Sequence, residues 1–224
     1  IVIITGPTAT GKTAAAIAFA QQVGGEIVSA DSMLVYRGMD IGTAKPTAQE
    51  RALVPHHMVD VAEPWEDFSA ARWQQGAEAA IADIRARGKL PIVAGGTGLY
   101  VRALQYPMAF AGAQGGGEAR KKWEEYLEIN GAQALHARLA QIDPASAARL
   151  PAGDVRRIIR ALEVYDLTGK TLTEKNAQDS LRAPRYRALT MGVRLPRKIL
   201  YERINRRVDA MIQEGLVQEV RSLL

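Results

Sequence analysis

The sequence predicts an α/β fold, with a parallel sheet flanked by helices and a helical insertion. Two observations carry this prediction. In the first 104 residues, short apolar runs alternate with segments of helical period, which is the pattern of strand–helix–strand units. After Leu104 the strand-like runs give way to helical segments. A chain of 224 residues is long enough for one such domain and an insertion.

The elements of the first part are expected in a regular order. A β-branched run at residues 1–4 is typical of a buried strand, and similar runs predict strands at 26–29, 57–61 and 90–94. Helices are expected at 13–23 and at 68–87, where Gly88 supplies a C-cap. Residues 30–46 form a loop with glycines at 38 and 42.

A phosphate-binding loop follows the first expected strand. Two glycines allow a tight turn whose backbone N–H groups face inward, a lysine adds a positive charge, and the next helix begins at the same point. The threonine hydroxyl is the usual Mg²⁺ ligand of such loops. The predicted fold is therefore P-loop NTPase-like, and the predicted diphosphate site comprises Gly6, Pro7, Thr8, Ala9, Thr10, Gly11, Lys12 and Thr13.

Three candidate elements of a site follow three different strands. The phosphate loop comes after residues 1–4, Asp31 comes after 26–29, and Thr97 comes after 90–94. Parallel sheets bind their ligands at the carboxyl ends of the strands. We therefore expect the loop, Asp31 and Thr97 to lie at one edge of the sheet.

The second part of the chain reads differently. Residues 107–117 are rich in Pro, Ala and Gly and predict a flexible linker. Helical segments without strands follow to residue 150, so we assign 105–150 to a helical insertion and 1–104 with 151–224 to the P-loop core. Within the core, a helix at 154–167 begins at Asp154 as N-cap, a strand returns at 187–195, and Pro196 starts the last helix.

Composition limits the classes of protein. Hydrophobic residues make up 47% of the chain, which supports a packed core, and the absence of Cys excludes disulfides and thiolate metal sites. No apolar run is long enough to span a membrane and no signal peptide is apparent, so we expect a cytoplasmic enzyme.

The charge is uneven along the chain. Residues 1–117 hold nine Lys and Arg against ten Asp and Glu, whereas 118–224 hold twenty against fourteen. A basic second half favours a polyanionic partner. A solvated, arginine-rich helical surface would give the same count.

Five segments carry a more specific pattern than the phosphate loop alone. They read GPTATGKT (6–13), DSMLVYRGMDIGTAKP (31–46), PHHMVD (55–60), GGTGLY (95–100) and RRIIRALEVY (156–165). In this order they resemble the bacterial tRNA dimethylallyltransferase family over nearly the whole chain, with the weakest likeness at 107–150. The segment 31–46 is the most specific, because other P-loop enzymes do not share it.

Members of that family usually continue past the point that corresponds to Leu224, with further helices and a basic end. The resemblance therefore implies a truncated chain, in which the diphosphate site is complete and tRNA binding is weakened.

The resemblance implies a reaction. Such enzymes move a dimethylallyl group from dimethylallyl diphosphate to N6 of adenosine 37 in tRNA and release diphosphate with the help of Mg²⁺. Asp31 matches the general base of the family. Lys12, Thr13, Thr97 and a C-terminal arginine would stabilise the diphosphate, with Thr13 as metal ligand.

Three arginines are candidates for the C-terminal arginine. Arg207 matches the family motif, and Arg203 and Arg206 lie on the same expected helix. An alternative interpretation makes Arg207 part of a surface ion pair with Asp209. We also expect a monomer that binds no membrane.

The tRNA-binding residues are likewise assigned by resemblance. The segment that meets the flipped adenosine matches Asp31, Ser32, Met33 and Leu34, together with Thr97. A second tRNA-binding segment matches Arg156, Arg157, Ile158, Ile159 and Arg160, whose arginines would bind phosphates. Alternatively, these arginines form helix-surface salt bridges with neighbouring acids.

Three other functions share parts of this pattern. A P-loop kinase of small molecules would have the same fold and phosphate loop, but would not need the segment 31–46. A prenyltransferase of free adenine nucleotides would use the same chemistry without a tRNA surface. A non-catalytic RNA-binding protein would not need Lys12, Thr13, Asp31 and Thr97 together.

Several conspicuous side chains are interpreted as structural. His56 and His57 are adjacent, so on a strand they face opposite sides and do not form a metal pair. Core packing explains Trp65, Phe68 and Trp73 better than base stacking, and Asp60 receives no role from the resemblance.

Overall fold

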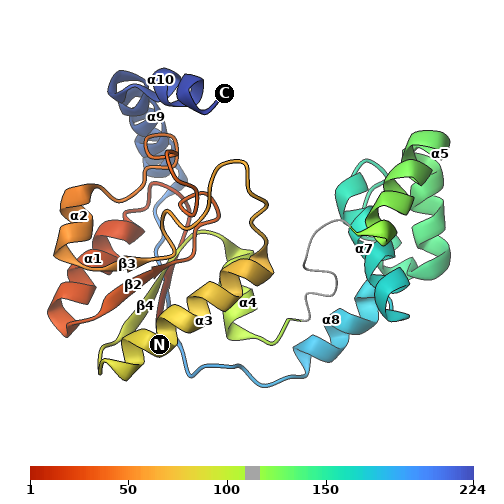
Figure 1. The fold of residues 1–224 in the computed structure, drawn as a ribbon, viewed down its shortest axis with the longest axis horizontal. Helices are drawn as coiled ribbons and strands as arrows, with labels where there is room; N and C mark the ends of the chain where they lie inside the picture. Colours follow the sequence, from red (N-terminus) through yellow and green to blue (C-terminus); the bar gives the residue numbers. More distant parts are fainter. Residues whose placement is uncertain (109–116) are drawn as a thin grey trace. The chain divides into compact units, whose positions relative to one another are not determined.

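In the computed structural model the chain forms two compact units, described over residues 1–108 and 117–224 (Figure 1). The sheet unit comprises Ile1–Gln105 and Arg185–Leu224, and the helical unit comprises Tyr106–Pro184. The linker expected at 107–117 lies almost entirely outside the described residues.

The described residues of the sheet unit form one five-stranded parallel sheet in the order β3-β2-β4-β1-β5. The α/β fold with a parallel sheet is thus confirmed. The strands are β1 (Val2–Thr5), β2 (Glu26–Ser29), β3 (His56–His57), β4 (Pro91–Gly95) and β5 (Leu189–Gly192).

One strand is shorter than expected. The sequence predicted a strand at 57–61, but β3 ends at His57. Met58 and Asp60 adopt positive φ angles of 61° and 56°. Such left-handed backbone cannot continue a strand, so the apolar pattern of this segment does not become a ladder.

Helices cover both faces of the sheet. On one face Ile3, Val28 and Val93 pack against α3 (Ala70–Ala86) and α4 (Gly98–Gln105). On the other face the alternate residues Val2, Ile27 and Ile92 pack against α1 (Lys12–Val23). Side chains of a strand alternate between faces, so a continuous apolar run such as β1 feeds both cores.

Three further helices complete the sheet unit: α2 (Ala48–Leu53), α9 (Arg197–Glu214) and α10 (Leu216–Leu223). A capping box of Thr47 and Glu50 starts α2. The helix expected at 68–87 is α3. Its C-cap is Arg87, and Gly88, which was expected as the C-cap, is the next residue and takes the left-handed conformation at φ 71°.

The helical unit consists of α5 (Glu118–Ile142), α6 (Pro144–Ala147), α7 (Val155–Thr168) and α8 (Leu172–Ser180). Its core joins α5 to α7, with Trp123, Leu135, Ile158 and Leu162 buried together. Gly131, at φ 78°, interrupts the helical backbone inside α5.

The boundary expected at residue 150 differs from the one observed. The helices α7 and α8 belong to the helical unit, which extends to Pro184, rather than to the P-loop core. The physical reason is packing: Ile158 and Leu162 of α7 complete the core of α5 and not that of the sheet. Asp154 holds the N-cap position of α7, but its side chain makes no capping hydrogen bond.

The charge follows this corrected boundary. The helical unit carries eleven Lys and Arg against ten Asp and Glu, whereas residues 185–224 carry nine against four. The basic excess of the second half therefore belongs mainly to the sheet unit. Among the helices described, none combines the length and apolarity that a bilayer crossing requires.

Candidate functional site

The phosphate loop joins β1 to α1 in a closed turn. Gly11 takes a left-handed conformation at φ 89° and caps α1, and the Thr10 hydroxyl donates to the Pro7 carbonyl at 2.9 Å. Gly6 leaves no room for a side chain, because a Cβ there would lie 2.5 Å from the Val193 carbonyl oxygen. The loop therefore presents the N-terminus of α1 to any bound anion.

The predicted convergence at the sheet edge is confirmed. The Thr97 hydroxyl accepts a hydrogen bond from the Ser32 backbone N–H at 3.0 Å and donates to the Ser32 hydroxyl at 3.3 Å. Gly95, two residues before Thr97, makes this contact possible, because a Cβ there would lie 2.2 Å from the Ala30 carbonyl oxygen. Thr97 thus supports the segment that carries Asp31.

Asp31 is positioned by a local turn. Its Oδ1 accepts the Met33 backbone N–H at 2.9 Å. Its second oxygen, Oδ2, makes no hydrogen bond within the described chain, and the side chain is partly exposed. One carboxylate oxygen is therefore held and the other can accept a proton.

Lys12 connects the carboxylate to the phosphate loop. Burial lowers the pKa of its ammonium, the negative charge of Asp31 opposes that shift, and Arg207 adds to it. Its Nζ also donates to the Pro7 carbonyl at 3.3 Å. Lys12 is therefore influenced by the charges of both Asp31 and Arg207.

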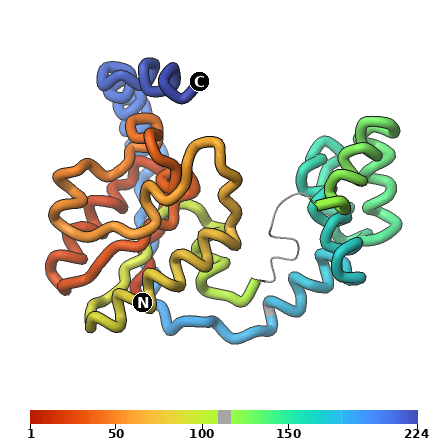
Figure 2. The backbone as a smooth tube through the Cα atoms, viewed as in Figure 1, coloured from red at the N-terminus to blue at the C-terminus, as the bar shows by residue number. Residues whose placement is uncertain are grey.

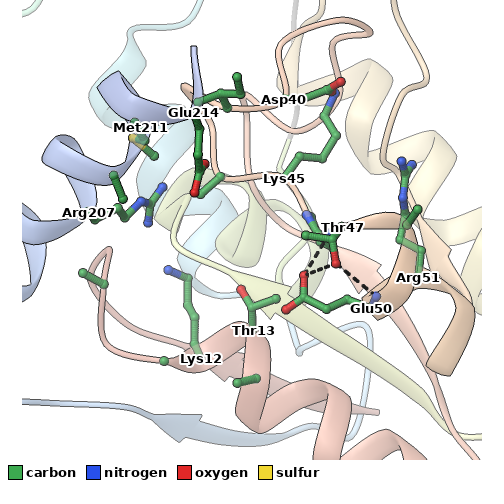
Figure 3. A pocket seen from close by; sticks show the side chains of 18 of the residues that line it. Lys12, Thr13, Asp40, Lys45, Thr47, Glu50, Arg51, Arg207, Met211 and Glu214 are labelled. Atoms are coloured by element: carbon green, nitrogen blue, oxygen red, sulfur yellow. Dashed lines mark hydrogen bonds and ion pairs between the residues drawn. The ribbon is translucent and has the colours of Figure 1, made fainter. Parts of the chain in front are cut away.

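A cavity of about 660 Å³ lies beside the phosphate loop (Figure 3). Its walls come from the phosphate loop, from the segment 40–51 and from α9. Lys12 and Thr13 line the cavity, whereas Asp31 and Thr97 are not among its described lining residues. Lys12 is therefore the side chain that faces the cavity and also interacts with Asp31.

The cavity carries an excess of positive charge. Lys45 is paired with Asp40 and Asp60, and Arg51 is paired with Asp60. Of the lining cations that the structure describes, three have no carboxylate ion-pair partner; they are Lys12, Arg203 and Arg207. The remaining lining carboxylates are Glu50 and Glu214, so five lining cations face three lining carboxylates. The cavity is therefore suited to a ligand with more than one negative charge.

The structure separates the three candidate arginines of α9. Arg207 donates to the Thr8 hydroxyl at 3.0 Å and to the Thr43 carbonyl at 3.3 Å, which ties it to the phosphate loop. Arg203 also lines the cavity, and a Cβ on Gly11 would lie 3.9 Å from its Nη1. Arg206 does not line it. The expected surface ion pair of Arg207 with Asp209 is not among the ion pairs of the described residues.

Sequence reasoning missed the role of the end of the segment 31–46. Lys45, whose side chain is 1% exposed, donates to the Tyr36 carbonyl at 2.7 Å and to the carboxylates of Asp40 and Asp60 at 2.5 Å each. This network organises the loop that forms one wall of the cavity. The sequence did mark this segment, because its GTAKP motif is specific to the family. The burial of Lys45 could not be predicted from it, because that burial depends on Asp40 and Asp60, whose positions the sequence does not give.

The second predicted tRNA-binding segment lies on α7. Arg156 and Arg157 are exposed, and Arg157 forms an ion pair with Asp154 at 3.3 Å. Arg160 is bound to Glu163 at 3.0 Å, and Glu163 is itself buried. The predicted salt-bridge alternative therefore holds for two of the three arginines, while Arg156 is exposed on the same helix.

Ile158 and Ile159 require a correction. Both were expected in the tRNA-binding segment, but their side chains are 0% and 3% exposed in the core of the helical unit. Their side chains hold α7 against α5 and are not available to RNA. The motif mixes surface arginines with core isoleucines because helical neighbours in sequence face different directions.

The structural interpretation of the histidines is confirmed. His56 Nδ1 lies 2.7 Å from the Val54 carbonyl oxygen, and His57 Nε2 lies 2.8 Å from Glu26 Oε2. Glu26 is buried and also binds Arg87 and Lys89. Trp73 is buried in the core as expected, but Trp65 is 82% exposed, so the packing prediction for Trp65 was wrong.

Comparison with known proteins assigns the chain to a family. The family model described as IPP transferase matches residues 34–224, and one described as isopentenyl transferase matches residues 1–54. The chain belongs to the IPP transferase family. The sequence motifs that predicted this relationship lie at the sheet edge and on α7.

Individual members of the IPP transferase family match the whole chain. It is 53% identical to a tRNA dimethylallyltransferase of Roseiflexus sp. (strain RS-1) and 50% identical to one of Geobacter metallireducens. Each comparison covers all of this chain and 72% of the relative. The relatives are thus longer than the sequence described.

Solved structures of IPP transferases share the fold. The tRNA isopentenylpyrophosphate transferase of Bacillus halodurans matches with a TM-score of 0.67 and 44% identity, over 99% of this chain and 69% of that one. A eukaryotic dimethylallyltransferase, described as acting on tRNA, matches with a TM-score of 0.86 and 32% identity over 100% and 55%. These relatives do not favour a small-molecule kinase or a prenyltransferase of free nucleotides.

Proposed function

We propose that this chain transfers a dimethylallyl group from dimethylallyl diphosphate to N6 of adenosine 37 in tRNA and releases diphosphate. The observation that carries the proposal is the cavity beside the phosphate loop, whose lining cations Lys12, Arg203 and Arg207 have no carboxylate ion-pair partner among the described residues, together with the electrostatic interaction of Lys12 with Asp31. The cations can bind a diphosphate, and the carboxylate can take the proton that an attacking amine loses. That the acceptor is tRNA is inferred from the relatives, which act on tRNA.

In the proposed reaction, the adenosine amine forms a bond to C1 of the dimethylallyl group while the bond from C1 to the diphosphate oxygen breaks. The electron pair of that bond leaves with the diphosphate. The proton of the amine goes to Asp31 Oδ2, which is the carboxylate oxygen without a hydrogen bond. Ser32, Met33 and Leu34 follow Asp31 directly and would contact the flipped base.

The leaving diphosphate is stabilised by donors that already face the cavity. Backbone N–H groups of the phosphate loop and Lys12 lie on the α1 side of the cavity, whereas Arg207 and, one helical turn before it, Arg203 come from α9. These groups are held in place before the reaction, so they favour charge that develops on the leaving group. Thr97 acts in this proposal by supporting Ser32 and the neighbouring Asp31.

The donor set also fits a magnesium ion. Thr13 places one hydroxyl in the cavity next to Lys12 (Figure 3), and the described residues contain no cluster of three or more His, Asp or Glu side chains that could hold a metal alone. Mg²⁺ is commonly bound by one or two protein ligands together with phosphate oxygens and water. When bound, it would neutralise part of the diphosphate charge, and Thr13 would be its protein ligand.

A separate surface of the helical unit is proposed to bind tRNA phosphates. Arg156 and Arg157 are its exposed cations, whereas the ion pair of Arg160 with Glu163 orders the segment. Phosphate contacts of this kind add affinity that falls as salt increases.

The direct test mixes the enzyme with Mg²⁺, labelled dimethylallyl diphosphate and unmodified tRNA that carries adenosine 37. We expect label in the tRNA and none when adenosine 37 is replaced by guanosine. Label in free AMP instead would mean a nucleotide prenyltransferase, and phosphate transfer from ATP to small acceptors would mean a kinase. Either result would replace the proposed function.

Lys12→Ala should weaken the binding of dimethylallyl diphosphate about 10- to 100-fold, because one charged hydrogen bond to the diphosphate is lost. Calorimetry with Mg²⁺ present measures the effect. Lys198→Ala removes an exposed lysine of α9 and serves as the control. An unchanged dissociation constant for Lys12→Ala would remove this residue from the diphosphate site.

A further inference from the structure

The carboxylate of Glu219 on α10 is held by three consecutive backbone N–H groups. Oε2 accepts from Asp40 at 2.7 Å and from Ile41 at 2.6 Å, and Oε1 accepts from Gly42 at 2.9 Å. Glu219 is about 180 residues away from these donors in the sequence and is partly buried against them. Three converging N–H groups form the kind of concavity that binds anions.

Both ends of the loop 38–42 lie close to α10, and Figure 2 shows the C-terminal helix beside it. A Cβ on Gly42 would lie 3.0 Å from Leu216 Cδ1, and one on Gly38 would lie 3.6 Å from Leu223 Cδ2. The space beside both glycines is therefore filled by apolar side chains of α10.

The residue that follows this loop contacts Arg207. It is Thr43, and its carbonyl oxygen accepts a hydrogen bond from Arg207 Nη2 at 3.3 Å. The other guanidinium nitrogen, Nη1, donates to the Thr8 hydroxyl of the phosphate loop at 3.0 Å. Arg207 thus bridges the loop that Glu219 holds and the loop that binds phosphate.

We propose that Glu219 is a positioning residue for the diphosphate site. Its carboxylate fixes the backbone of residues 40–42, which fixes the Thr43 carbonyl and, through it, the guanidinium of Arg207 at the phosphate loop. The inference rests on the proposed function, since it assumes that the cavity binds the diphosphate of the substrate. Glu219 itself does not line the cavity among the residues described.

The negative charge of Glu219 is essential to this role. Burial alone would raise the pKa of its carboxyl, but the N–H groups of residues 40–42 and the nearby Lys45 hold that pKa below its usual value. A glutamine at this position would turn an amide N–H₂ toward backbone donors. At least one of the three N–H groups would then lose its acceptor.

The test measures binding of inorganic diphosphate with Mg²⁺ by calorimetry, in the wild type and in Arg207→Ala. Glu219→Gln should weaken binding about tenfold in the wild type and less than about twofold in Arg207→Ala, because both changes disturb the same contact. Gly42→Ala, whose Cβ would press against Leu216, should reproduce this pattern from the loop side. Gln218→Ala, on the same helix, should leave binding unchanged.

Equal weakening by Glu219→Gln in both backgrounds, or none in either, would overturn the inference. If Glu219→Gln does not fold, the test uses Gly42→Ala alone. Equal weakening of diphosphate binding by Gly42→Ala in the wild type and in Arg207→Ala would then overturn the inference. The readout needs no acceptor. A wild type that binds diphosphate without modifying tRNA would therefore contradict the proposed function and leave the test of Glu219 intact.

Discussion

Replacing Asp31 by alanine is expected to lower kcat for tRNA prenylation about 10²- to 10⁴-fold, which is the usual contribution of a general base. The carboxylate follows β2 at the sheet edge and interacts electrostatically with Lys12, and its Oδ2 is available to take the amine proton. Dimethylallyl diphosphate binding should change little, because Asp31 does not line the cavity that holds the cations. Single-turnover transfer of label to tRNA measures the effect.

Asp31→Asn separates proton transfer from positioning. The amide oxygen can still accept the Met33 backbone N–H, so the local turn is kept, but the amide cannot take the proton. We expect the asparagine variant to be as slow as the alanine variant. Asp67→Ala, at an exposed loop position, is the control. Near-normal turnover by Asp31→Asn would show that Asp31 organises the turn and is not the base.

Trp73→Ala is expected to lower the free energy of unfolding by about 3–5 kcal/mol, the typical cost of removing a large buried aromatic side chain. The indole is 0% exposed, and its ring lies 4.4 Å from that of Tyr100 in a stacked arrangement. Its Nε1 donates to the Ser29 carbonyl at 2.9 Å, two residues before Asp31. Urea unfolding followed by circular dichroism measures the loss.

A second variant of Trp73 separates the hydrogen bond from the packing of the ring, and a variant of Trp65 is the control. Trp73→Phe keeps an aromatic ring and removes the hydrogen bond to Ser29, so a loss of about 1–3 kcal/mol is expected. Trp65→Ala is the matched control, because Trp65 is 82% exposed and its loss should cost less than about 0.5 kcal/mol. Similar losses for Trp65→Ala and Trp73→Ala would contradict the assignment of Trp73 to the core.

The sheet edge was predictable because its signals are local. Strand β1, the phosphate loop and α1 are contiguous, and parallel topology brings the ends of β2 and β4 to the same side. The contact of Thr97 with Ser32 follows from that topology, although it joins residues 65 positions apart. The roles of Asp31, Lys12 and Arg207 in catalysis remain predictions for the experiments above.

The helical unit was less predictable because its boundary depends on packing. Amphipathic helices such as α7 bury an apolar face, but the helical spacing of their apolar residues does not predict which other element covers that face. Ile158 and Ile159 could therefore be read as part of an RNA-binding motif, although they lie in the core with α5. The helical unit ends at Pro184 because it includes α8, a helix that was not predicted from the sequence since its residues are mostly polar.

The sequence by itself determined the α/β class, the phosphate loop, the convergence of Asp31 and Thr97 and the family, because each depends on short motifs or on parallel topology. Only the tertiary structure decided that Arg207 and Arg203 face the cavity, that Lys45 is buried and that Glu219 holds residues 40–42. These contacts join segments up to about 200 residues apart. Their side chains and backbone donors become partners only when α9 and α10 pack against the loop, so no local pattern encodes them.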